Sequence, residues 1–119
     1  MSRNEKIRAP QYRPARHERL LDCELSQGGR LLAISGVLDE LAVPELREML
    51  HAATEDYTKD LTVDLSRVDF LPSVALGVLV AAMGSGVARI RLVAQEGTIA
   101  SRVLAITGLD FTAAGPANT

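Results

Sequence analysis

The sequence predicts an α/β domain in which helices pack on a mixed β-sheet. Two observations predict this fold. A pair of strand-like segments joined by a glycine-containing turn comes first, and helix-like and strand-like segments then alternate along the chain. A hairpin joins antiparallel strands, whereas strand–helix–strand units join parallel strands by right-handed crossovers. We therefore expect the order β-β-α-β-α-β-α, with room for a short final strand.

The hairpin is predicted within residues 20–38. In "LLDCEL", apolar Leu21, Cys23 and Leu25 alternate with Asp22 and Glu24, which is the pattern of a half-buried strand. "SQGGR" supplies a turn, and "LLAISGVL" is the second strand. We therefore expect Cys23 to be a buried thiol. As the single cysteine it excludes an internal disulfide and fits a reducing compartment.

The next two elements are a helix and a strand. "VPELREMLHAATED" predicts an amphipathic helix, and Pro44 suits its first turn. The apolar residues on its inner stripe are Val43, Leu46, Met49, Leu50 and Ala53. "LTVDL" then returns to strand alternation. Its Asp64 points away from the apolar side, which favours a local hydrogen bond over a functional role.

The last part of the chain predicts two more helices around a strand. The apolar run after Pro72 indicates a helix from about Ser73 to Met83, and "VARIRLVA" is a strand. "TIASRVLAITG" is a second helix with Gly108 as its C-terminal cap. The stripe expected to face the core is Ile99, Val103 and Ile106. "LDFTAAGPANT" leaves space for a short edge strand.

Length and charge limit the kinds of protein that this sequence can be. The chain has 119 residues, enough for one domain, and only two Tyr, two Phe and no Trp, so its core must be aliphatic. We expect a flexible basic tail at 1–17, a domain at 18–114 and a frayed end at 115–119. Residues 1–16 have a net charge of +4, so with −2 overall the remainder carries −6. An acidic body disfavours nucleic acid as a partner.

The sequence also predicts a cytoplasmic protein. No apolar segment follows the basic residues at the start, so a signal peptide is not expected. The longest apolar run, from Leu71 to Met83, is shorter than the about 20 residues that cross a bilayer, so we expect no membrane insertion. A strand edge near residues 20–25 is compatible with a monomer or a weak dimer.

Residues typical of catalysis are missing from the sequence. No Cys/His cluster has metal-ligand spacing, and no Walker-type loop is present. His17 and His51 fall in the tail and on a helix, so Ser73 has no evident base. We therefore expect no enzyme, no metal and no cofactor.

Ser73 stands where a helix begins, and two roles fit that place. A helix N-terminus has backbone N–H groups without partners and a partial positive charge. Ser73 either caps these groups, which stabilises by about 1 kcal/mol, or accepts a phosphate, which they would hold. Asp39, Glu40 and Asp69 are predicted at the same edge of the sheet, because the loops that follow parallel strands meet there. They are either solvated or in contact with a partner.

Four short motifs occur in order along residues 20–112. Gly36, Leu38 and Asp39 match G-x-[LI]-D. Val63, Asp64, Leu65 and Ser66 supply the residue types of V-x-D-[LF]-S, with Val63 directly before Asp64. Residues 70–79 match most of F-[ILM]-D-S-[ST]-G-[LI]-x-x-L, and the late "TGL" matches [ST]-G-[LF]. Together these motifs resemble the anti-sigma factor antagonist family, whose fold is the STAS domain.

The resemblance implies a switch between partners. An unphosphorylated member binds an anti-sigma factor that is also an ATP-dependent serine kinase, and thereby frees a sigma factor. The kinase phosphorylates the first Ser of D-S-[ST]-G, where Ser73 stands, and a phosphatase restores it. The residues expected at the partner-binding surface are Asp39, Glu40, Ser66, Arg67, Asp69, Leu71 and Ser73. For Arg67, an ion pair with Asp69 is the alternative to contact with an acidic partner.

The chain departs from the motif at three positions. Pro72 replaces Asp, Val74 replaces the second hydroxyl residue and Ala75 replaces Gly, which adds a methyl group where a kinase loop is expected to approach. These changes favour a first rival function, a scaffold or transporter-associated STAS subunit that binds its partner constitutively. A second rival is a sensor of a nucleotide or lipid, against which the lack of a phosphate-binding loop and of aromatic residues counts.

Overall fold

The computed structural model describes residues 21–114, and the tail predicted at 1–17 and the end predicted at 115–119 lie outside the described residues. The elements run as β1 (Leu21–Ser26), β2 (Leu31–Val37), the 3-10 helix η1 (Glu40–Ala42), α1 (Val43–Ala53), β3 (Leu61–Phe70), α2 (Ser73–Met83), β4 (Ile90–Gln95), α3 (Ile99–Thr107) and β5 (Thr112–Ala114). The predicted order is confirmed, including the short final strand.

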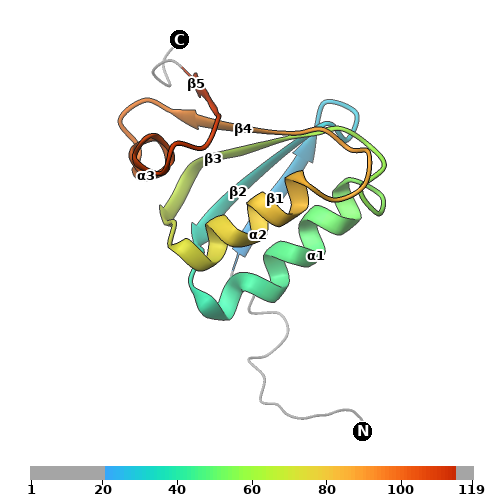
Figure 1. The fold of residues 1–119 in the computed structure, drawn as a ribbon, viewed down its shortest axis with the longest axis horizontal. Coiled ribbons are helices and arrows are strands. Elements are labelled where there is room, and N and C mark those ends of the chain that lie inside the picture. Colours follow the sequence, from blue (N-terminus) through green and yellow to red (C-terminus); the bar gives the residue numbers. More distant parts are fainter. Residues whose placement is uncertain (1–20, 115–119) are drawn as a thin grey trace, which may run out of the picture.

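The strands form one mixed sheet (Figure 1). Its spatial order is β1-β2-β3-β4-β5, the same as the order along the chain. β1 pairs with β2 in the antiparallel sense, and the later neighbours are all parallel. The sheet therefore brings the carboxyl ends of β2, β3 and β4 to one edge, from which η1, α2 and α3 each begin.

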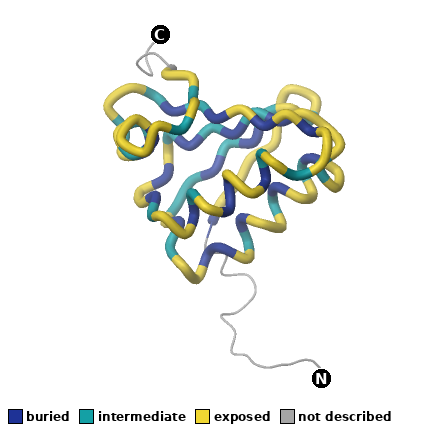
Figure 2. The backbone as a smooth tube through the Cα atoms, in the orientation of Figure 1, coloured by how far each residue is buried: buried dark blue, intermediate teal, exposed yellow. Residues whose placement is uncertain are grey.

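Helices α1 and α2 pack against each other on one face of the sheet (Figure 1), and α3 packs against β3 and β4. Buried backbone is concentrated along the inner strands and the facing sides of the helices (Figure 2). The core is aliphatic, as predicted. Its largest fully buried side chains include Ile34 of β2, Leu46 and Leu50 of α1, Val63 and Leu65 of β3, and Leu79 of α2. Each such side chain stabilises the fold by about 1.5–3 kcal/mol.

The prediction for β1 is wrong beyond its first residue. Leu21 is buried, but Cys23 is exposed and the side chain of Leu25 is 51% exposed. Both lie opposite buried residues of β2, so they point to the side of the sheet that carries the helices. They stay accessible because β1 is the first strand of the sheet and α1 does not cover it. A shallow hollow remains there, between Cys23 and Leu25 on one side and Met49 and Ala52 on the other.

The predicted inner stripe of α3 is wrong at Ile99 and Ile106, whereas Val103 packs against the core as predicted. Ala100 and Leu104 are its buried residues, whereas Ile106 is 84% exposed and Ile99 is 44% exposed. Apolar residues cover a wide arc of this short helix, so periodicity alone fits more than one rotation about the helix axis. In the observed rotation the small residue Ala100 is on the buried side of α3, which lets the helix lie close to the sheet. The predicted cap is confirmed, since Gly108 has φ 80° in the left-handed region that glycine favours.

Candidate partner-binding edge

The candidate site lies where β2 and β3 end side by side. Val37, the last residue of β2, pairs with Phe70, the last residue of β3. The chain then continues from β2 through η1 into α1 and from β3 into α2, so α1 and α2 begin at the same edge (Figure 1). Asp39, the N-cap residue of η1, and Ser73, the first residue of α2, therefore lie at this edge. This is the arrangement expected from the parallel strands.

Asp39 has a defined structural role at this edge. Its carboxylate caps η1, because Oδ1 accepts hydrogen bonds from the N–H groups of Leu41 at 3.0 Å and Ala42 at 3.2 Å. The side chain is half-buried, and the neighbouring Glu40 is exposed. Asp39 therefore shapes the loop and keeps a carboxylate at the surface of the site.

Ser73 does not cap α2, so the capping role considered from the sequence is wrong. The N-cap residue is Pro72, with φ −82° and ψ 172°, and no side chain makes a capping hydrogen bond. Ser73 is already the first helical residue, beyond the position from which a hydroxyl reaches the exposed N–H groups. The carbonyl of Pro72 accepts hydrogen bonds from the N–H groups of Ala75 and Leu76, both at 3.0 Å. The Ser73 side chain is exposed.

A shallow hollow beside Ser73 combines apolar and acidic side chains. It is lined by Asp39, Glu40, Leu41, Phe70, Pro72, Ser73 and Val74. Leu41 is 74% exposed, Phe70 49% and Val74 39%. Large apolar side chains that gather at a surface next to charged ones are typical of protein–protein contact sites. The hollow therefore has the chemistry of a docking surface for another protein.

Leu71 cannot contribute to that surface, because only 3% of it is exposed. It belongs to the hydrophobic core, while the preceding Phe70 is exposed. The strand alternation shifts here, because the pairing of β2 with β3 contains register irregularities between Ala33 and Ser35 and between Gly36 and Val37. The predicted contribution of Leu71 to a partner contact is therefore wrong.

Ser66 and Asp69 lie outside the hollow. The Oγ of Ser66 accepts a hydrogen bond from the N–H of Gln95 at 2.7 Å, which ties the end of β4 to β3. The predicted local hydrogen bond of Asp64 is confirmed, since its Oδ1 accepts from the N–H of Ser66 at 2.9 Å. Asp69 is exposed near the end of β3. Of the two, only Asp69 is placed to act at the surface.

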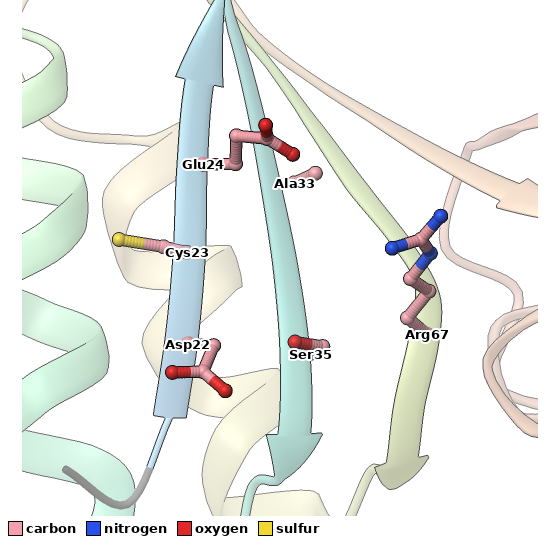
Figure 3. A pocket seen from close by; sticks show the side chains of 6 residues that line it. All are labelled: Asp22, Cys23, Glu24, Ala33, Ser35 and Arg67. Carbon is pink, nitrogen blue, oxygen red and sulfur yellow. The ribbon is translucent and has the colours of Figure 1, made fainter.

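Arg67 points to a different part of the sheet. Figure 3 shows it together with Asp22, Glu24 and Ser35, on the face away from α1 and α2. The strand register explains this grouping, because Arg67 pairs with Ser35 and Ser35 pairs with Asp22. Arg67 is therefore separated from the hollow beside Ser73, and the predicted grouping of Arg67 with the other site residues is wrong.

Four residues of the hollow were not predicted as site residues from the sequence: Leu41, Phe70, Pro72 and Val74. Leu41 directly follows Asp39 and Glu40, but Leu38 and Ala42 on either side of them are fully buried, so the sequence carried no clear signal for its exposure. Phe70 carried no such signal, because its exposure depends on the register irregularity in the sheet.

Within residues 21–114, no three His, Cys, Asp or Glu side chains are grouped so that they could bind a metal ion. In the same part of the chain, no helix combines the length and the apolar character that a membrane span requires.

Comparison with known proteins identifies the family to which this fold belongs. Residues 23–111 match the STAS_2 family, described as "Mlab, STAS domain". The crystal structure of an anti-sigma factor antagonist from Mycobacterium paratuberculosis is similar with a TM-score of 0.64 and 30% sequence identity, covering 76% of this chain and 80% of that one.

Curated relatives give a shorter match. The anti-sigma-B factor antagonists of Staphylococcus aureus strains NCTC 8325 and COL are each 40% identical over 47 residues, which is 40% of this chain and 44% of theirs. The matched segment thus spans less than half of these relatives. The fold and the family match define the class of the protein as a STAS domain. Within that class, the chain belongs to the anti-sigma factor antagonist family, as its motifs predicted.

Proposed function

We propose that this protein is a non-enzymatic, cytoplasmic antagonist that binds an anti-sigma factor through the hollow beside Ser73 and so releases a sigma factor. One observation carries the proposal. Ser73 is an exposed hydroxyl at the start of α2 that caps nothing, and it lies among exposed Leu41, Phe70 and Val74. The hydroxyl is therefore available for modification at the centre of a surface suited to protein contact.

Phosphorylation of Ser73 by a serine kinase would switch this surface off, and a phosphatase would restore it. A phosphate adds a charge of about −1.5 to −2. The start of a helix favours such an anion on the free protein. A partner that covers the hollow would have to bury the dianion next to the carboxylates of Asp39 and Glu40, at a cost of several kcal/mol. Modification is thus compatible with the fold and opposed to the complex.

The three departures from the family motif affect this proposal differently. Ala75 is fully buried, so its methyl group points into the core and away from an approaching kinase. Pro72 holds the N-cap position in an extended conformation, which is compatible with a helix that starts at Ser73. Val74 extends the apolar surface by replacing a hydroxyl with a side chain that is 39% exposed.

Val74 also supports the second candidate, a STAS scaffold that binds its partner constitutively. An apolar residue next to Ser73, the proposed phosphate acceptor, strengthens contact with a partner protein without contributing to a phosphorylation switch. The two candidates share the docking surface and differ in whether Ser73 is modified.

Intact-mass spectrometry of the protein purified from its own cells separates these candidates. The antagonist proposal predicts a fraction that is heavier by one phosphate, mapped to Ser73, and a loss of partner capture by Ser73→Asp. Ser26→Asp is the matched control, because Ser26 is exposed at the end of β1, where it pairs with Leu31 at the opposite end of β2. An unmodified Ser73 under all growth conditions, with Ser73→Asp still binding, would support the constitutive scaffold instead.

A further inference from the structure

We propose that the outer edge of β1, the side of the strand away from β2, binds an extended segment of a partner protein in which apolar residues alternate with Lys or Arg. Three observations carry the proposal: the direction of the backbone groups of β1, the hollow beside its apolar side chains, and the carboxylates on its other face. The edge shares no residue with the hollow beside Ser73, so this inference goes beyond the proposed function and does not rest on it.

The strand order leaves β1 at the end of the sheet. β1 pairs with β2, and within residues 21–114 no strand lies on its other side. The edge of a terminal strand presents N–H and C=O groups that can pair with another chain. Extended peptides bind to such edges as an added strand, with affinity from main-chain hydrogen bonds and specificity from alternate side chains.

The pairing of β2 decides which backbone groups of β1 face outward. The N–H of Thr62 in β3 donates to the carbonyl of Arg30 at 2.8 Å, so that carbonyl points toward β3. Backbone groups of successive strand residues point to alternate sides, so those of Ala33 point toward β1. Ala33 pairs with Glu24. The N–H and C=O groups of Glu24 are therefore the ones that face β2.

Cys23 and Leu25, on either side of Glu24, direct their N–H and C=O groups to the outer edge. The N–H of Leu21 agrees with this alternation, because it donates to Oε1 of Glu45 at 2.7 Å instead of to β2. A partner strand alongside β1 would therefore form main-chain hydrogen bonds with Cys23 and Leu25.

On the face that carries the helices, a partner strand would meet an apolar surface. Cys23 and Leu25 border the hollow that Met49 and Ala52 of α1 line on the other side. Leu25 is 51% exposed. The side chains of an added strand alternate between the two faces of the sheet, as those of β1 do. Apolar side chains at alternate positions of the partner would fill the hollow and cover Leu25.

On the opposite face, the neighbours of a partner strand would be Asp22 and Glu24, both exposed (Figure 3). Opposite charges on neighbouring strands stabilise their pairing, and like charges oppose it. Glu48 is a further exposed carboxylate, at the hollow on the helix face. Lys or Arg is therefore the favoured residue at the partner positions beside Asp22 and Glu24.

The arginines nearest to β1 leave these carboxylates available to a partner. Arg67 shares their face of the sheet, but no ion pair within residues 21–114 involves it. A strand added beyond β1 would lie three strand spacings from β3, or about 14 Å, which exceeds the Debye length of about 8 Å. Arg47 of α1 lines a different hollow, together with Tyr57. Arg30 lies in the turn that joins β1 to β2.

A second copy of this chain is disfavoured at the edge. Antiparallel pairing of two β1 strands, centred on Cys23, would set Asp22 beside Glu24 of the other copy. Like charges at such positions destabilise strand pairing, and charged edge strands prevent self-association in natural proteins. The same carboxylates thus reject another acidic edge and favour a basic segment.

Cys23 supplies a probe for the test, because it is exposed and is the single cysteine of the chain. The full chain is incubated with a peptide that alternates Lys and Val, and alkylation of Cys23 by iodoacetamide is followed by mass spectrometry. Bound peptide restricts access to the thiol, so alkylation should slow at least about fivefold at saturation. A peptide that alternates Glu and Val is the control and should not protect. Equal protection by both peptides, or protection by neither, would overturn the proposal.

Charge reversal tests the specificity of the edge. Asp22→Lys with Glu24→Lys should lower affinity for the Lys peptide at least about tenfold and make the Glu peptide the better ligand. Glu96→Lys with Asp110→Lys is the matched control, because both residues are exposed near β4 and β5, on the other side of the sheet. An unchanged preference in the first variant, or a reversed one in both, would contradict the proposal. If the reversed charges unfold β1, Asp22→Asn with Glu24→Gln should abolish the preference between the peptides.

Methylated peptides test whether the peptide binds as a strand. The N–H groups that face a neighbouring strand belong to alternate residues. One Lys–Val peptide is N-methylated at its Val residues and another at its Lys residues. One of them should lose at least about tenfold in affinity, through lost hydrogen bonds, and the other should bind normally. Equal affinities of the two methylated peptides would refute pairing with the edge of β1.

Ser73→Asp separates this inference from the proposed function. Protection of Cys23 by the Lys peptide should be the same in this variant as in the parent protein, because the edge and the hollow beside Ser73 share no residue. Loss of that protection would contradict a separate binding edge. Failure of the protein to bind an anti-sigma factor would count against the proposed function and leave the peptide result unaffected.

Discussion

Helices α2 and α3 both follow a parallel strand, but their first turns are built in different ways. At α3, Thr98 is the N-cap residue: its Oγ1 accepts from the N–H of Ser101 at 3.2 Å and donates to the carbonyl of Gln95 at 2.7 Å. At α2 the N-cap residue is Pro72, which offers no side-chain acceptor, and the Ser73 hydroxyl lies one residue too late to cap. One helix start uses its hydroxyl for stability, and the other leaves its hydroxyl exposed at a surface suited to binding.

The largest expected effect is a loss of partner affinity when a negative charge is introduced at Ser73, at the uncapped start of α2. Ser73→Asp should weaken partner binding by at least about a hundredfold, or about 2.7 kcal/mol, because a buried unpaired charge is costly. The melting temperature should change little, since a carboxylate is favourable in the first turn of a helix. Isothermal titration calorimetry with the anti-sigma factor measures the affinity. Binding equal to that of the parent protein would contradict a contact at Ser73.

Substitution of the exposed apolar residues near the two helix starts should also affect partner affinity differently. Phe70→Ala should reduce partner affinity about tenfold, as expected for an exposed aromatic residue at the centre of an interface. Ile99→Ala is the matched control, because Ile99 is 44% exposed at the start of α3 and Phe70 is 49% exposed. Equal losses for both variants would move the docking surface away from the α2 edge.

Stability should depend more on the start of α3 than on the start of α2, which is the reverse of the order expected for partner binding. Thr98→Ala should lower the free energy of unfolding by about 1 kcal/mol through loss of the cap. Ser73→Ala should change it by less than about 0.5 kcal/mol, the usual range for a surface substitution without a specific contact. Urea denaturation followed by circular dichroism measures both. A loss at Ser73 as large as that at Thr98 would show that the Ser73 hydroxyl stabilises α2 after all.

The smallest effect tests whether a cap can be introduced at α2. Pro72→Asp places an acceptor at the N-cap, while Pro72→Ala removes the proline without adding one. The aspartate variant should be about 0.5–1 kcal/mol more stable than the alanine variant. The same urea titration compares them, and equal stabilities would mean that α2 does not start at Ser73 in solution.

Strand alternation and helical periodicity predicted burial correctly where a residue is buried by its own element and its immediate neighbours. The inner stripe of α1 is confirmed, with Val43, Leu46 and Leu50 buried and Met49 and Ala53 packed against the core. They failed at Cys23 and at Ile106, and the surface position that the family resemblance implied for Leu71 is also wrong. In each case burial depends on something distant in the sequence: whether α1 covers β1, how α3 is rotated on the sheet, and where the pairing of β2 with β3 is irregular.

The features of the candidate site also divide into those that local sequence predicted and those that depend on distant contacts. Local chemistry predicted a helix that starts at Ser73, a loop at Asp39 and their meeting at one edge, because parallel strands require it. The sequence by itself therefore determined the fold class, the family, the order of the elements and the charge of the tail and the domain. Only the tertiary structure decided that Ser73 caps nothing, that Phe70 is exposed while Leu71 is buried, and that Arg67 lies on the other face. Those outcomes depend on strand register and helix packing, which are set by contacts between segments far apart in the chain.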